Sequence, residues 1–193
     1  RGVLMPARTG EEYRDGLRNR GVEIFIRGER VKDVTTHPAF RNGVDTLASL
    51  YDMQHEAGEQ DDMTYISPTT GERVGTSFLK PETVEDLEKR RKMMSSWARR
   101  TNGMMGRTPD YMNVSFMAMA AAQGYFEQNR TEFGANIRRY YEYIRERDLV
   151  LTHTLLNFQR SRLSQATPLE DSTDTALTVI EERTDGVVVH GAR

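Results

Sequence analysis

Apolar residues recur every three or four positions through most of the first 148 residues, which is the spacing of amphipathic helices. Thr9 and Glu12 have the spacing of a capping box, which predicts that the first helix begins at Gly10. Tyr13 and Leu17 should then face the core. The expected helices cover residues 10–20, 38–55, 81–100, 109–124 and 132–147.

The same periodicity predicts which face of each later helix is buried. The expected inward residues are Phe40, Val44, Leu47 and Tyr51 in the second helix, Val84, Leu87, Met94 and Trp97 in the third, Met112, Phe116, Met119 and Ala120 in the fourth, and Phe133, Ile137, Tyr140, Tyr141 and Ile144 in the fifth.

Short alternating segments between the helices predict hairpins. Ile24 and Ile26 precede the turn 27–30, and residues 64–66 and 74–79 flank the turn sequence at 67–71. The acidic stretch 58–62 is expected to be a loop.

The pattern changes after Asp148. Residues 149–156 form a β-compatible apolar run, and 176–180 and 187–189 are strand-like on either side of an Asp-Gly turn. Three or four strands leave open edges and too little sheet to be stable alone. We therefore expect an α+β chain, helical over 1–148 and entering a β domain over 149–193, that forms the front part of a longer protein.

Composition limits the classes of protein to which the chain can belong. The chain has 193 residues, no Cys and 37% hydrophobic residues, so it can bury a core, whereas a disulfide scaffold or a thiolate metal site is excluded. Neither a signal peptide nor an apolar run of about 20 residues is present. A cytoplasmic protein with no membrane partner is the expectation.

The charge pattern gives little support for nucleic acid or metal ligands. The formal charge is −2, and the basic runs 90–92 and 99–100 share a helix with acids, which predicts a solvated face of mixed charge. His37 is expected at a helix entry, His55 at a helix end and His190 in a strand, with no metal-ligand spacing between them.

The stretch from Gly103 to Tyr111 contains the strongest candidate chemistry. Two glycines precede Arg107, and Thr108-Pro109-Asp110 starts a helix, so a guanidinium and a phenol would lie near one helix N-terminus. An anion- or phenol-binding corner is one interpretation, and a tight helix–helix turn with a solvated Arg107 is the other.

Two further features allow similar alternatives. His153 lies in the apolar run and is expected mid-strand, as a buried structural histidine or as a functional one. The methionines of residues 93–119 could line a pocket for a planar ligand or fill an ordinary core.

Long motifs connect the chain to one enzyme family. They occupy residues 8–13, 28–42, 50–52, 103–111, 152–153 and 185–193. On these residues the chain resembles the large, oxygenase component of two-component 4-hydroxyphenylacetate 3-monooxygenases. The resemblance implies an acyl-CoA-dehydrogenase-like fold, with a helical N-terminal domain, a middle β-barrel that has only begun here, and a C-terminal helical bundle, absent from this chain, that builds a homotetramer.

The resemblance also implies a reaction and its residues. Reduced FAD from a separate flavin reductase activates O₂, and oxygen is transferred to the carbon ortho to a phenol hydroxyl, as in 4-hydroxyphenylacetate. Arg107, Tyr111 and His153 would converge on the phenol oxygen as catalytic residues, and the substrate site would comprise Arg107, Thr108, Pro109, Asp110, Tyr111 and His153. Tyrosine derivatives, hydroxycinnamates and chlorophenols are substrates of the same family.

The flavin contacts implied by the resemblance are Asn157, Gln159, Arg160, Ser161 and Arg162. Phe158 stands where the family usually has proline, whose ring would fix the backbone φ angle.

A dehydratase of 4-hydroxybutyryl-CoA shares the fold but needs cysteine ligands for an iron–sulfur cluster, and this chain has none. An inactive helical binding module is the non-enzymatic alternative.

Overall fold

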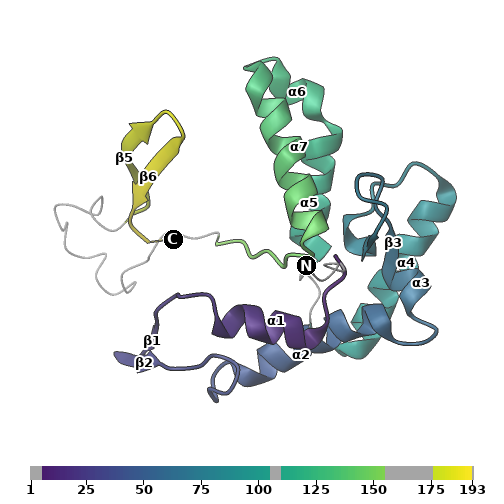
Figure 1. Cartoon of the computed structure of the whole chain (residues 1–193), viewed down its shortest axis with the longest axis horizontal. Coiled ribbons are helices and arrows are strands. Elements are labelled where there is room, and N and C mark those ends of the chain that lie inside the picture. Colours follow the sequence, from purple (N-terminus) through teal and green to yellow (C-terminus); the bar gives the residue numbers. More distant parts are fainter. Residues whose placement is uncertain (1–5, 105–109, 155–175, 193) are drawn as a thin grey trace, which may run out of the picture. The chain divides into compact units, whose positions relative to one another are not determined.

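The computed structural model describes residues 6–104, 110–154 and 176–192, the side chain of Asp110 excepted. The chain divides into two compact units, residues 1–151 and 152–193. The elements of the first unit, drawn in Figure 1, are α1 Gly10–Arg18, β1 Ile24–Ile26, β2 Glu29–Val31, α2 Arg41–Asp52, η1 Met53–His55, α3 Gln60–Met63, β3 Thr64–Ile66, β4 Arg73–Gly75, η2 Thr76–Phe78, α4 Val84–Arg100, α5 Asp110–Ala121, α6 Gln123–Glu127 and α7 Thr131–Glu146.

Helices α1 and α2 pack against each other over an aromatic contact. The rings of Tyr13 and Tyr51 stack at 5.1 Å between centroids, and Val44 and Ala48 complete the buried cluster. The predicted capping box is confirmed, because Thr9 and Glu12 bond reciprocally at the start of α1. The capping box stabilises the start of α1 through local contacts, and the Tyr13–Tyr51 stack then packs the helix against α2.

Gly10 lets α1 approach α2 closely. Its N–H donates to Asp52 Oδ1 at 2.7 Å, and a Cβ at this position would lie 2.6 Å from the carbonyl oxygen of Ala48. Real Cβ atoms do not approach oxygen so closely, so glycine is a packing requirement here.

Both predicted hairpins of the helical part are present. β1 pairs with β2 in antiparallel register through a turn in which Arg27 and Gly28 both have positive φ, at 52° and 84°. The second hairpin pairs β3 with β4, and its return strand is shorter than expected because the chain enters the 3₁₀ helix η2 at Thr76.

Helix η2 packs against α5 and α7. Phe78 is fully buried in a cluster with Met117 of α5 and with Tyr141 and Ile144 of α7. Figure 1 shows α5, α6 and α7 running alongside one another as a helical group. Tyr141 donates from its hydroxyl to the carbonyl of Phe78, which fixes α7 to η2.

The second unit contains one hairpin within its described residues. β5, Thr178–Arg183, pairs with β6, Gly186–His190, with a register irregularity between Val179 and Glu181. The predicted Asp-Gly turn is confirmed, and His190 lies in a strand as expected. No closed barrel is present among the described residues.

Several element boundaries differ from the sequence predictions. The second helix begins at Arg41 instead of Pro38, since Pro38 lies in a turn closed by the N–H of Phe40 on the carbonyl of His37. The stretch 58–62 is partly helical, in α3. The third helix begins at Val84, because Thr83 and Asp86 form its capping box. The fourth ends at Ala121, and Gly124 lies within the separate α6.

The predicted inward face of α4 was wrong for Val84, Leu87 and Met94, which are exposed, and held for Trp97, which packs against a buried cluster. Val84 is 71% exposed and Leu87 57%, whereas Arg90 and Met93 are buried. Arg90 turns inward because its guanidinium donates hydrogen bonds to the carbonyls of η2 and Leu79, and these bonds fix which side of α4 faces the core. The expectation that residues 90–92 are solvated is therefore wrong for Arg90.

The other predicted faces hold in part. Val44 and Tyr51 of α2 and Tyr141 and Ile144 of α7 are buried as expected. In contrast, Met119, Phe133 and Tyr140 are exposed. The most buried positions of α5 are Asn113 and Met117, which the apolar pattern did not select.

Candidate functional site

The predicted substrate corner is described only in part. α4 ends at Arg100 as expected, and Gly103 follows it with a φ of 73° and an N–H that bonds the carbonyl of Ala98 at 2.8 Å. Arg107, Thr108 and Pro109 lie outside the described residues, and α5 begins at Asp110. Tyr111, in the first turn of α5, is 45% exposed.

The remaining predicted residues belong to the second unit. His153 is exposed and lies in a segment without regular secondary structure, so its expected mid-strand position is wrong. Residues 149–154 form no strand, and Leu149 and Leu151 instead pack against the buried cluster of Phe78 and Ile144. The flavin residues Asn157, Gln159, Arg160, Ser161 and Arg162 lie outside the described residues. Of the predicted catalytic residues, Tyr111 and His153 are therefore described and Arg107 is not.

The structure does describe what holds the start of α5. Asn113, two residues after Tyr111, is 2% exposed and donates from Nδ2 to the hydroxyl of Ser77 at 2.7 Å. Ser77 belongs to η2. A buried amide on α5 thus fixes the helix that carries Tyr111 to a segment 36 residues earlier in the chain.

Arg90 of α4 bonds the same segment. Its Nη1 donates to the carbonyls of Thr76, Ser77 and Leu79 at 3.2, 2.9 and 3.2 Å. A charged donor satisfies carbonyls that would otherwise be buried without partners. Sequence reasoning missed this role, although the spacing of Arg90, Met93 and Ser96 on one helix face could have indicated it.

A second buried cluster surrounds Asp148, five residues before His153. Asp148 Oδ2 accepts from the backbone N–H of Arg8 at 3.0 Å and from Gln54 Nε2 at 2.6 Å. Its carbonyl accepts from Arg8 Nε at 3.0 Å and from the Tyr51 hydroxyl at 3.0 Å. Asp148 thus bonds residues that lie more than 90 positions earlier in the chain.

Burial sets the electrostatics of this cluster. Loss of water raises the pKa of the Asp148 carboxyl, and the hydrogen bonds from Gln54 and Arg8 only partly oppose that rise. Burial likewise raises the pKa of Tyr51. Tyr51 is therefore a hydrogen-bond donor at neutral pH and cannot serve as a base.

A third polar cluster joins α7 to the β3–β4 hairpin. Glu146 accepts from Ser67 at 2.6 Å, from Thr70 at 2.8 Å and from Arg145 Nε at 2.7 Å. Burial raises the pKa of Glu146, but these hydrogen bonds outweigh it and the net shift is downward. The carboxylate is held charged, as a structural group.

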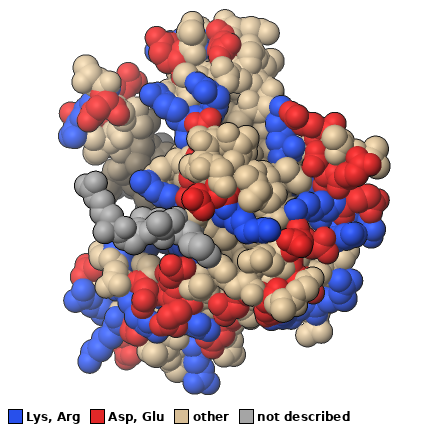
Figure 2. All heavy atoms as spheres, turned by 45° about the vertical axis from the view of Figure 1, so that its right-hand side comes forward, with Lys and Arg blue, Asp and Glu red and all other residues tan. Residues whose placement is uncertain are grey.

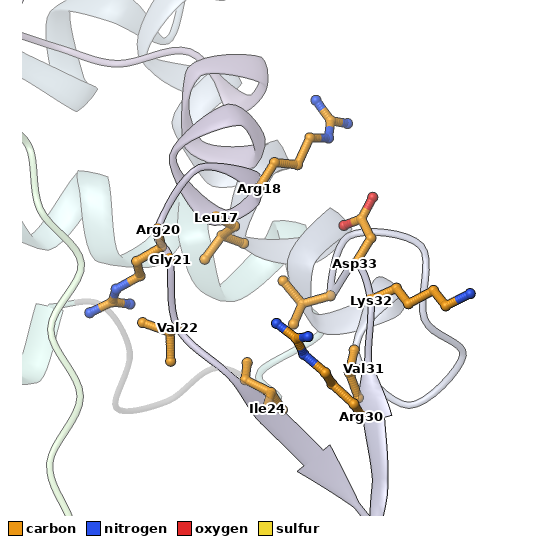
Figure 3. A pocket seen from close by; sticks show the side chains of 11 residues that line it. Leu17, Arg18, Arg20, Gly21, Val22, Ile24, Arg30, Val31, Lys32 and Asp33 are labelled. Carbon is orange, nitrogen blue, oxygen red and sulfur yellow. The ribbon is translucent and has the colours of Figure 1, made fainter.

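A groove of about 560 Å³ lies beside the β1–β2 hairpin (Figure 3). Leu17, Val22 and Ile24 form its apolar floor. Figure 3 shows that Arg20 and Lys32 extend away from it on opposite sides, so its cations do not converge on a common point. The groove lacks the converging polar groups of a catalytic site.

Neither the charged surface of Figure 2 nor the described metal-ligating side chains indicate another binding site. On the face drawn in Figure 2 the acidic and basic side chains are interspersed. Among the described residues no three His, Cys, Asp or Glu side chains gather as a metal-binding group. No helix within residues 6–104, 110–154 and 176–192 is long and apolar enough to cross a membrane.

Known proteins match the chain closely. The family described as 4-hydroxyphenylacetate 3-hydroxylase N terminal matches residues 9–193. The oxygenase component of 4-hydroxyphenylacetate 3-monooxygenase from Geobacillus sp. (strain PA-9) is 46% identical over 99% of this chain. The chain spans 38% of the length of that relative.

Solved structures agree on the fold. The oxygenase component HpaB of 4-hydroxyphenylacetate 3-monooxygenase, complexed with FAD and 4-hydroxyphenylacetate, superposes with a TM-score of 0.82 at 43% identity. That match covers 96% of this chain and 38% of the solved one. The predicted acyl-CoA-dehydrogenase-like fold class is confirmed, in its helical N-terminal part.

The predicted fold-sharing rival is also found. An archaeal 4-hydroxybutyryl-CoA dehydratase from N. maritimus gives a TM-score of 0.75 at 21% identity, over 96% of this chain and 36% of that one, which shows a common fold alone. Since the hydroxylase family matches almost the whole chain, from residue 9 to residue 193, the chain belongs to the 4-hydroxyphenylacetate 3-hydroxylase family, whose N-terminal region it carries.

Proposed function

We propose that this chain is the N-terminal region of the oxygenase component of a two-component, FAD-dependent monooxygenase that hydroxylates a phenol at the ortho carbon. The observation that carries the proposal is the likeness to HpaB, solved with FAD and 4-hydroxyphenylacetate, at 43% identity over 96% of the chain. The proposed product from 4-hydroxyphenylacetate is a catechol.

Three residues of this chain act on the phenol in the proposal. Arg107 stabilises negative charge on the phenol oxygen, and Tyr111 fixes that oxygen by a hydrogen bond. His153 orients the hydroxyl and accepts or shares its proton. A phenol with phenolate character has an electron-rich ortho carbon, which is the position to be oxygenated. Thr108, Pro109 and Asp110 complete the substrate corner.

The flavin would be held by the segment 157–162. Arg160 and Arg162 supply guanidinium groups for an anionic cofactor, and Gln159, Asn157 and Ser161 supply amide and hydroxyl partners, so the donor set suits FAD. Reduced FAD supplies the activation of O₂ when it is bound. Phe158 leaves the backbone of this segment less restrained than proline would.

The described structure supports the proposal by showing how Tyr111 is held. Asn113 and Arg90 fix α5 and α4 to the same short helix η2, at Ser77. A catalytic phenol needs a rigid helix beneath it, because small displacements of a positioning group slow a reaction strongly. The polar contacts of η2 hold the described start of α5, which carries Tyr111.

Partners and location complete the proposal. A separate flavin reductase would deliver reduced FAD, and the whole protein would be a homotetramer in the cytoplasm with no nucleic-acid or membrane partner. The rival reading as an iron–sulfur dehydratase lacks its cysteine ligands, as the chain contains none. The remaining alternative is an inactive helical module that binds a partner.

The test is catechol formation. The full-length protein carrying this chain is incubated with 4-hydroxyphenylacetate, FAD, NADH and a flavin reductase, beside the 193-residue chain alone. Catechol from the full-length protein supports the proposal. A folded full-length protein that neither binds FAD nor forms product from any of the phenols named above contradicts it and favours the binding module.

A further inference from the structure

A small cavity lies in the first unit, lined by residues of α2, η1, β4, η2, α4 and α5 and by Asp148 and Leu149, which follow α7. Its volume is about 20 Å³, close to the space that one water molecule needs. Its wall is mixed: Leu47 and Leu50 are apolar, whereas Trp97, Asn113 and Asp148 carry polar atoms. All of its lining residues belong to residues 1–151.

Two residues of this wall each carry a buried polar atom that has no hydrogen-bond partner among the described residues. The two atoms are Trp97 Nε1 and Asn113 Oδ1. The only other such atom in the described part of the chain, Thr76 Oγ1, belongs to a residue that does not line the cavity. Buried polar groups are nearly always satisfied in folded proteins, so two on one cavity indicate a ligand.

The chemistry of the two atoms identifies the ligand class. The indole Nε1–H is a donor only, and an amide oxygen is an acceptor only. Asn113 Nδ2 is already committed to Ser77 Oγ, which leaves Oδ1 as the acceptor. A metal cation cannot accept from the indole, and a simple anion cannot donate to the amide. A neutral molecule that both accepts and donates, and that fits this volume, is water.

We propose that the cavity is a binding site for one structural water, which accepts from Trp97 Nε1–H and donates to Asn113 Oδ1. The water joins α4 to α5 two residues from Tyr111. Asp148, Gln54 and Ser77 line the same space and offer its second hydrogen a partner. The site is independent of the proposed reaction, since it exists whether or not a phenol is hydroxylated.

The first test is a crystal structure of the protein at a resolution that shows ordered waters. The expected result is one full-occupancy peak within hydrogen-bond distance of both Trp97 Nε1 and Asn113 Oδ1. A cavity without density, or a direct bond that pairs each of these atoms with protein, overturns the proposal.

The second test removes the donor and keeps the shape. Trp97 is replaced site-specifically by benzothienylalanine, whose sulfur stands in for the N–H. If water bridges the two groups, the replacement lowers the melting temperature by about 2–4 °C and removes the peak. If no water is bound, deleting an unsatisfied donor raises the melting temperature, which contradicts the proposal.

A packing control separates these effects from a general loosening of the core. Met93 is fully buried in the apolar cluster against which Trp97 packs, and it has no N–H or O–H group. Met93→Leu should therefore leave the density peak in place. Loss of the peak in this variant would show that packing alone, and not the indole donor, sets the occupancy of the site.

Discussion

Arg90 Nη1 lies 2.9 Å from the carbonyl oxygen of Ser77, and the hydroxyl of that same serine accepts a hydrogen bond from Asn113. One residue of a 3₁₀ helix thus joins α4 to α5. Tyr111, which we propose binds the phenol oxygen, lies on α5 two residues before Asn113, so this contact holds the helix that carries it.

Arg90→Met is expected to destabilise the protein by about 3 kcal/mol, because three carbonyls lose a charged donor inside the structure. Arg91→Met is the matched control. Arg91 is exposed and, among the described residues, pairs with Glu88 one turn away on the same helix, so its replacement should change little. Urea unfolding of both variants measures the difference. Equal small effects would mean that Arg90 does not organise η2.

Gly10→Ala is expected to destabilise by about 1–3 kcal/mol, since the new Cβ would lie 2.6 Å from both the Ala48 carbonyl and Asp52 Oδ2. Gly16→Ala in the same helix should stabilise by about 0.4–1 kcal/mol, because its nearest neighbour is 3.8 Å away and alanine restricts the unfolded chain. Thermal melts of the two variants should shift in opposite directions. A Gly10→Ala melt at or above the wild-type value would contradict the close approach of α1 to α2.

Asp148 and Glu146 are expected to give opposite dependences of stability on pH. Burial raises the pKa of Asp148 in the folded state, so the folded protein binds more protons and loses stability as pH rises from 3.8 through the folded pKa. Hydrogen bonds lower the pKa of Glu146, so its contribution is present above 4.5 and is lost as pH falls through the folded pKa.

The measurement is urea unfolding of wild type, Asp148→Asn and Glu146→Gln between about pH 4 and pH 7. Relative to Asp148→Asn the wild type should lose stability as pH rises, and relative to Glu146→Gln it should gain. Parallel curves for all three proteins would show that neither carboxyl has a shifted pKa.

The sequence predicted the local elements well where a local signal decides them. The capping box at Thr9, the turn at residues 27–30 and the Asp-Gly turn before β6 depend on neighbouring residues, and all three are observed. Helix faces were predicted less well. Arg90 and Asn113 are polar residues whose burial depends on carbonyls and hydroxyls supplied by η2, a segment that the sequence pattern assigned to a strand.

The candidate site was reached by resemblance more than by pattern. Composition and spacing left Arg107 and His153 open between a functional and a structural role, because a guanidinium after two glycines also suits a tight turn. The Asp148 cluster was missed altogether. Its partners Arg8, Tyr51 and Gln54 lie more than 90 residues away, and no local pattern reports such a contact.

The most direct test of the central claim is the rate of catechol formation by full-length protein in which Arg107 is replaced by alanine, with Arg91→Ala as the matched control. Wild type and Arg91→Ala are expected to convert 4-hydroxyphenylacetate at similar rates. Arg107→Ala should fall by about 100-fold or more, as loss of one charge-stabilising donor does elsewhere. Full activity of a folded Arg107→Ala variant would contradict the assignment of this corner as the phenol site.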